Sequence, residues 1–162
     1  MRRAHCLFAI GMSLWSAVAV GSQATDGGPL SGALRAHVQD EPFQMVTSVR
    51  GLPLGVRDAL QKLFASPGLD IADPGAEFQV TDVGVNAKRP IRRLVTAGCS
   101  ADHHCLLYYE RAGTEHTWHV ALFHWTPAAT RFEGGGTAPR GLTTIDDVRR
   151  AILAEGIKAR FW

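Results

Sequence analysis

Residues 105–125, CLLYYERAGTEHTWHVALFHW, decide the fold. Apolar and aromatic side chains fill both halves of this stretch, and the turn-forming pair Ala112-Gly113 lies between them. Two such runs around a short turn that contains glycine are typical of a β-hairpin. Because both faces of the two runs are largely apolar, we expect other elements to cover the sheet on both sides.

Taking Ala112 and Gly113 as the two turn residues predicts the register of this hairpin. The facing pairs are then Arg111 with Thr114, Tyr109 with His116, Leu107 with Trp118, and Cys105 with Val120. In this register His104 and His119 share one face at diagonal positions, where Cα atoms lie about 7–8 Å apart.

Outside the hairpin, the pattern of apolar residues predicts strands on both sides and a helix near each end of the domain. The predicted strands are 43–49, 78–83, 91–97 and a short edge strand at 130–133, and the predicted helices are 56–64 and one from Thr143 or Thr144 to Gly156. Gly134–Gly136 is predicted to end the sheet. This order indicates an α+β fold, with a four- to five-stranded antiparallel sheet between an N-terminal and a C-terminal helix. A cystatin-like roll, in which the sheet wraps around one helix, has a compatible order.

The first 24 residues have the features of a signal peptide. Arg2 and Arg3 form a basic start, and residues 7–20 are apolar without a charge, which is too short to cross a bilayer. Ser22-Gln23-Ala24 supplies the small residues of a cleavage site. We therefore expect export with cleavage after Ala24, or alternatively after Ala19, to the periplasm or, as the second choice, to the extracellular space.

After cleavage we expect a flexible tether over residues 25–41, with one turn of helix at the short apolar stretch 33–36, and a single domain over residues 42–162. The whole chain has 17 basic and 15 acidic residues, and the leader contains two of the basic ones and no acidic one. The remaining domain is neutral, which argues against nucleic-acid binding, since that depends on neutralising phosphates. It also lacks a second apolar run long enough to span a membrane.

Cys99 and Cys105 are the two cysteines that remain after the leader is removed. An even pair in an exported chain is most simply a disulfide. Five intervening residues can connect two antiparallel strands, and facing strand positions lie within disulfide range. A cysteine nucleophile or a metal thiolate is the alternative interpretation.

Histidines are concentrated around the hairpin, at positions 103, 104, 116, 119 and 124. In the predicted register, His104 and His119 could bind zinc or copper together, with Asp102 as a third ligand. The other interpretation is that these histidines are ordinary hydrogen-bonded residues of a sheet and that the domain has no cofactor. The sequence contains no HExxH or CxxC motif to favour a metal.

The end of the hairpin also offers groups for acid–base chemistry or for binding. Tyr109, Glu110, Glu115 and His116 would gather there, and a histidine beside a carboxylate can transfer a proton. The nearby Arg92 and Arg93 belong to a basic run that could meet an acidic partner. Tyr109, His116, Arg92 and Arg93 are therefore the candidate binding surface.

From these patterns the sequence predicts a small, exported, non-enzymatic binding or inhibitory module. Its partner would be another protein or a component of the cell envelope. The alternatives are an envelope protein that binds zinc or copper and a small hydrolase that uses the histidine, glutamate and tyrosine side chains near the hairpin tip.

Overall fold

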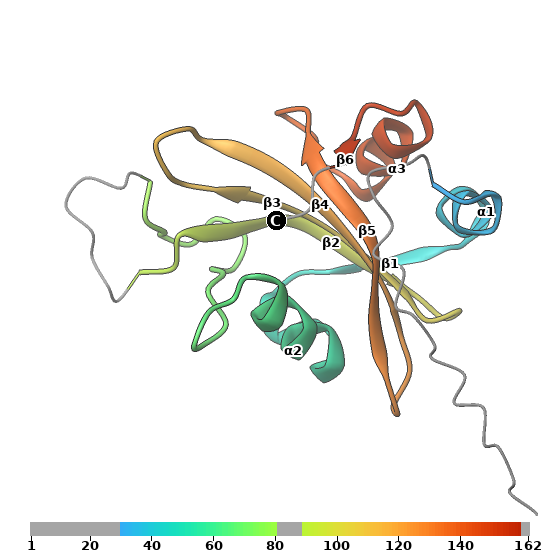
Figure 1. Cartoon of the computed structure of the whole chain (residues 1–162), viewed down its shortest axis with the longest axis horizontal. Coiled ribbons are helices and arrows are strands. Elements are labelled where there is room, and N and C mark those ends of the chain that lie inside the picture. The colour runs from blue at the N-terminus through green and yellow to red at the C-terminus, as the bar shows by residue number, and fades with distance from the viewer. Residues whose placement is uncertain (1–29, 81–88, 160–162) are drawn as a thin grey trace, which may run out of the picture.

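The computed structural model describes residues 30–80 and 89–159. Within these ranges the chain forms one antiparallel sheet with the strand order β1-β2-β3-β4-β5-β6, so the strands lie in the order of the sequence (Figure 1). The elements are α1 (Gly32–Asp40), β1 (Phe43–Val46), the 3-10 turn η1 (Val49–Gly51), α2 (Leu54–Leu63), β2 (Arg92–Ser100), β3 (His104–Arg111), β4 (Thr117–Trp125), β5 (Thr130–Ala138), α3 (Ile145–Leu153) and β6 (Lys158–Ala159). This arrangement confirms the predicted α+β class with an antiparallel sheet between helices.

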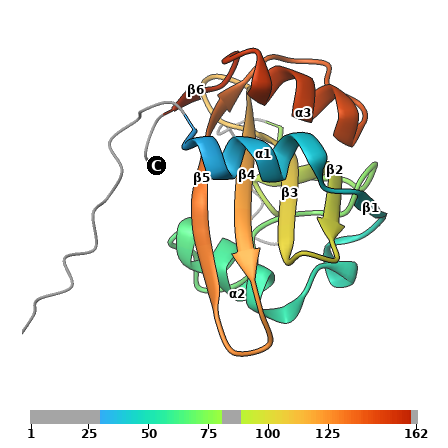
Figure 2. The ribbon, with the colours of Figure 1, turned by 90° about the vertical axis from the view of Figure 1, so that its right-hand side faces the viewer.

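Helices cover both faces of the sheet, as Figures 1 and 2 show. On one face, Val56 and Leu60 of α2 pack against a cluster that includes Leu107 and Phe123. On the other face, α1 and α3 pack against a second cluster, which includes Leu106. The expectation that both faces are covered is therefore confirmed, and the arrangement differs from a cystatin-like roll around a single helix.

Part of the segment predicted to be a tether is the helix α1. The Ser31 side chain caps it by accepting a hydrogen bond from the backbone N–H of Leu34. Leu34 and Val38 lie one turn apart, and the side chain of Val38 is fully buried against the α3 side of the core. The Arg149 side chain also donates a 2.7 Å hydrogen bond to the carbonyl of Val38. The packed domain therefore begins before residue 42, because this short apolar stripe has a partner in α3.

The central hairpin has a longer turn than the sequence predicted. Strand β3 ends at Arg111 and β4 begins at Thr117, and Arg111 faces Thr117 while Tyr109 faces His119. The buried Ala112 donates its N–H to the carbonyl of Ile91, so packing removes it from the expected two-residue turn. Compared with the predicted pairing, in which Tyr109 faced His116, the register of β4 is shifted by three residues. Because this number is odd, each side chain of β4 lies on the face opposite to the one predicted.

Two other strand predictions need correction. Gly134–Gly136 does not end the sheet but lies inside β5, where Gly135 faces Ala121 of β4. The glycine run fits there because the two backbones approach closely: a Cβ on Gly135 would lie 2.2 Å from the carbonyl oxygen of Val120.

Residues 78–80 are not a strand, although the N–H of Gln79 donates to the carbonyl of Pro90. The rest of that predicted strand, 81–83, lies outside the described residues.

The predicted disulfide is present between Cys99 and Cys105. The two cysteines face each other across β2 and β3, as the spacing predicted. Cys105 is fully buried in the core on the α2 side of the sheet, and Cys99 packs against the same core.

Replacing both Cys99 and Cys105 with serine is expected to lower the free energy of unfolding by about 2 kcal/mol, because the crosslink restricts a short loop of the unfolded chain. Urea denaturation of the oxidised protein and of the double variant measures the difference. Intact mass before and after reduction is the control and should differ by two hydrogen atoms. Two freely titrating thiols in the native protein would contradict the assignment.

No helix in the described ranges is long and apolar enough to cross a membrane. The predicted leader, residues 1–24, lies outside those ranges, and so do residues 25–29 of the predicted tether.

Candidate metal centre

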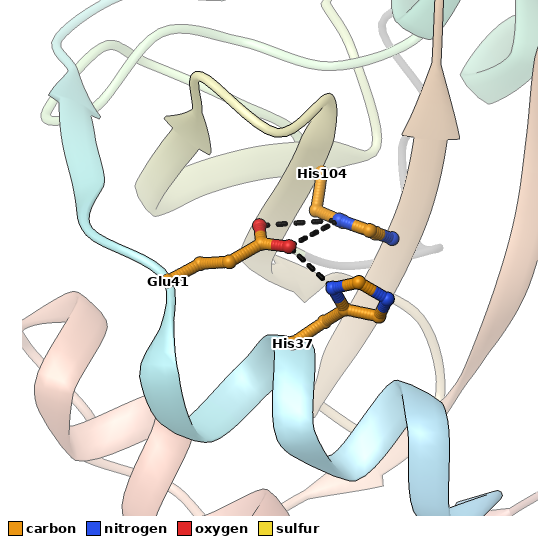
Figure 3. A group of neighbouring side chains, drawn as sticks. All are labelled: His37, Glu41 and His104. Atoms are coloured by element: carbon orange, nitrogen blue, oxygen red, sulfur yellow. Dashed lines mark hydrogen bonds and ion pairs between the residues drawn. The ribbon is translucent and has the colours of Figure 1, made fainter.

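Three side chains meet where α1 ends and β3 begins: His37, Glu41 and His104 (Figure 3). Glu41 is the residue that caps the C-terminus of α1, and His37 precedes it by one helical turn. Residues four apart lie on the same side of a helix, so both side chains point toward His104, the first residue of β3. The site therefore joins two segments that are far apart in the sequence.

The Glu41 carboxylate is the centre of this group and is buried, with 6% of its residue surface exposed. Its Oε1 lies 2.5 Å from Nδ1 of His37 and 2.9 Å from Nδ1 of His104. Its Oε2 accepts a hydrogen bond from the hydroxyl of Ser100 and lies 3.1 Å from Nδ1 of His104. A buried carboxylate requires such partners to compensate for lost hydration.

Burial lowers the pKa of His104 below its ordinary value, because the charged imidazolium loses hydration in the packed sheet. The neighbouring Glu41 opposes this shift, whereas His37 and His124 add to it. The lowered pKa keeps the imidazole neutral over a wider range of pH. A neutral imidazole is the form that binds a metal ion.

The geometry of the three side chains fits one metal ion. One ligand atom from each residue can be chosen so that all three lie within 4.8 Å of one another. In Figure 3 the two imidazole rings, from α1 and from β3, lie next to each other with centroids 4.2 Å apart, and the carboxylate faces both from one side. The side chain of His37 is 46% exposed, so the group opens to solvent on that side. Two imidazoles and a carboxylate, with a position left for water, form a donor set that suits zinc or copper.

Further histidines lie beside this group. His124 faces His104 across β3 and β4, and the centroids of their rings are 5.1 Å apart. His103 packs its ring edge-on against Trp125, with the ring centroids 5.3 Å apart. His124 therefore lies directly beside His104, whereas His103 contacts His124 and Trp125.

The structure brings His104 into the group but does not bring His104 and His119 together. His119 faces Tyr109 across the hairpin and belongs to the face that α2 covers, whereas His104 faces the α1 and α3 side. Nε2 of His119 lies 2.8 Å from the hydroxyl of Thr117. Asp102, the third ligand expected from the sequence, is exposed and is not part of the group. The longer turn of the hairpin is the physical reason for this difference.

Sequence reasoning missed His37 and Glu41 because it assigned them to a tether. The spacing His-x-x-x-Glu places both side chains on one side of a helix, but this signal is meaningful only if residues 32–40 are helical. The cap at Ser31 and the apolar pair Leu34 and Val38 are the features that would have indicated the helix.

The candidate binding surface divides between the two faces of the sheet. Tyr109 is buried, and its ring stacks on that of His119. Arg92 is also buried; its guanidinium lies 2.5 Å from the carboxylate of Asp70 and stacks over the ring of Phe64. Tyr109 and Arg92 are therefore part of the packed interior and do not form a surface for a partner.

Arg93 and His116 converge on Glu110 instead. Nε of Arg93 donates to one carboxylate oxygen of Glu110 at 2.6 Å, and Nε2 of His116 lies 2.7 Å from the other oxygen. Because both oxygens are occupied and Tyr109 lies on the opposite face, the predicted acid–base group does not assemble as one site. Glu115 is exposed near the turn.

Comparison with known proteins gives no relative from which a role could be transferred. No protein family, curated protein or solved structure matches this chain.

Proposed function

We propose that this chain is an exported, non-enzymatic binding protein that holds a zinc or copper ion through His37, Glu41 and His104. The observation that carries the proposal is the buried carboxylate of Glu41 in contact with two imidazoles, with ligand atoms within 4.8 Å of one another. Export to the periplasm, or alternatively to the extracellular space, rests on the predicted signal peptide of residues 1–24.

The distances from the two histidines to Glu41 require only a small adjustment to accept an ion. Bonds of about 2.0–2.1 Å in a tetrahedral zinc site separate the ligand atoms by about 3.3 Å. The Nδ1 atoms of both histidines lie 2.5–2.9 Å from Oε1 of Glu41, so each contact would open by less than about 1 Å. Ser100 would keep its hydrogen bond to the carboxylate and hold it in position.

The contacts of Ser100 support a binding role over hydrolysis. Its hydroxyl donates to Glu41, and it also accepts the backbone N–H of His104 at 3.0 Å. An activated serine instead donates its proton to a basic imidazole. The burial of Tyr109 and Arg92 likewise favours a metal ion over the protein or envelope partner that the sequence predicted.

Zinc is expected to stabilise the protein after chelator treatment and dialysis. When free zinc is a hundredfold above Kd, mass action adds about 2.7 kcal/mol to the free energy of unfolding, which raises Tm by several degrees. Replacing His37 with alanine should remove this response, since half of that side chain is exposed and its loss leaves the core intact. Calorimetric titration with zinc and copper and thermal unfolding measure both effects.

The matched control is His103→Asn, because His103 lies next to the site but is not part of the ligand group. Its φ of 68° is a left-handed conformation that asparagine tolerates better than most residues. This variant should keep the full zinc response, and the response should fade below about pH 6 as imidazoles become protonated. A full response in His37→Ala, or none to either ion in the unchanged protein, would reject the proposal.

A further inference from the structure

A second candidate site is a cavity of about 370 Å³ between η1, α2 and the segment 69–76. It adjoins the core on the α2 side of the sheet, whereas the His37–Glu41–His104 group lies on the α1 and α3 side. Its lining residues are Val49, Arg50, Arg57, Leu69, Ile71, Ala72, Asp73 and Ala76. This volume is at the lower end of the range for pockets that bind small molecules.

Arg57 is the unusual residue of this cavity. Its Nε is buried and makes no hydrogen bond within the described part of the chain. In contrast, the guanidinium groups of Arg92 and Arg93 are paired with carboxylates at 2.5 Å. A guanidinium presents its donors in a planar fork that matches a carboxylate, so Arg57 lacks the partner that its geometry suits.

The remaining lining limits the kind of anion that would fit. Val49, Ile71 and Ala72 are buried apolar residues and give the cavity an apolar wall. Asp73 accepts the backbone N–H of Val49 at 2.6 Å and adds one negative charge to the positive charges of Arg50 and Arg57. The two arginines and one aspartate leave the cavity with a net charge of +1, which favours a monoanionic ligand over a phosphate dianion. The apolar wall favours a ligand whose uncharged part is also apolar.

From these features we infer that the cavity binds a small organic carboxylate with an aliphatic or aromatic body, whose carboxylate pairs with Arg57. Arg50, which is exposed at the same cavity, adds positive charge that attracts the anion. The apolar part of the ligand contacts the wall formed by Val49, Ile71 and Ala72. This site is independent of the proposed metal ion, since the two lie on opposite faces of the sheet.

Calorimetric titration of the metal-free full protein with benzoate, hexanoate and inorganic phosphate tests this inference. Benzoate or hexanoate should bind with a Kd of about 1 mM or tighter, and phosphate at least tenfold more weakly. Arg57→Gln should weaken carboxylate binding at least tenfold, and Arg57→Lys should give an intermediate loss because the charge remains without the fork. Tm and far-ultraviolet circular dichroism check that each variant is folded.

Arg150→Gln is the control, because Arg150 is exposed on α3 and pairs with Asp147 on the other side of the sheet. It should leave carboxylate binding unchanged. The inference fails if neither carboxylate shows binding at a concentration about ten times the expected Kd, or if phosphate binds as tightly as benzoate. It also fails if Arg57→Gln binds the carboxylates as tightly as the unchanged protein does. None of these outcomes depends on zinc, so the two sites can be tested separately.

Discussion

Replacing Gly135 with alanine is expected to lower the free energy of unfolding by about 3 kcal/mol or more. The added Cβ would lie 2.2 Å from the carbonyl oxygen of Val120 and 3.2 Å from the Cα of Ala121. These are backbone atoms, which cannot rotate away as a side chain can, so β4 and β5 must separate. Urea denaturation at neutral pH measures the change.

Gly32→Ala is the matched control for this substitution. Gly32 is the first residue of α1, and a Cβ there would have no heavy atom within 4 Å. Alanine favours a helix over glycine by about 0.5–1 kcal/mol, so this variant should be unchanged or slightly more stable. Equal stability of the Gly135 and Gly32 variants would contradict the close approach of β4 and β5.

Acidification is expected to destabilise the protein through His119 by about 3 kcal/mol between pH 7 and pH 4. Burial, together with the smaller effect of the positive charges of Arg111 and Arg92, lowers the pKa of His119 to about 4. The unfolded chain takes up the proton at an ordinary pKa of about 6.5, so it binds more protons than the folded state in this range. The stabilisation is therefore present above pH 6.5 and is lost as the pH falls toward 4.

His119→Gln should reduce the slope of the free energy of unfolding against pH by the equivalent of nearly one proton, because glutamine does not titrate. Urea denaturation at pH 7, 5.5 and 4 compares the two proteins. Part of the slope should remain in the variant, since the pKa of His104 is lowered as well. His103→Asn removes an exposed histidine and should leave the slope unchanged; an identical slope in His119→Gln would contradict the role of His119.

The sequence predicted the fold well where its apolar pattern was long and regular. The helix at 56–64, the helix that begins at Thr144 and the paired strands around Cys99 and Cys105 all appear in the structure close to their expected bounds. These elements depend on local periodicity and on turn residues, both of which a single sequence displays.

The candidate site could be predicted only in part, because its geometry depends on contacts between distant segments. His104 was identified, but the choice of His119 as its partner depended on a two-residue turn. Packing of Ala112 against the segment near Ile91 determines the longer turn, and no local pattern reveals it. His37 and Glu41 were missed for a similar reason, because α1 is short and is stabilised by α3.

The order of the strands also determines the sequence in which the molecule can assemble. Each strand pairs with its neighbour along the chain, and the loops that join β2, β3, β4 and β5 are short, so this part of the sheet can form rapidly. The contacts that attach α1 to α3 join residues 111 and 118 positions apart, and loop closure makes them costly until the sheet exists. Docking of α1 is therefore a late event, and it is the step that brings Glu41 to His104.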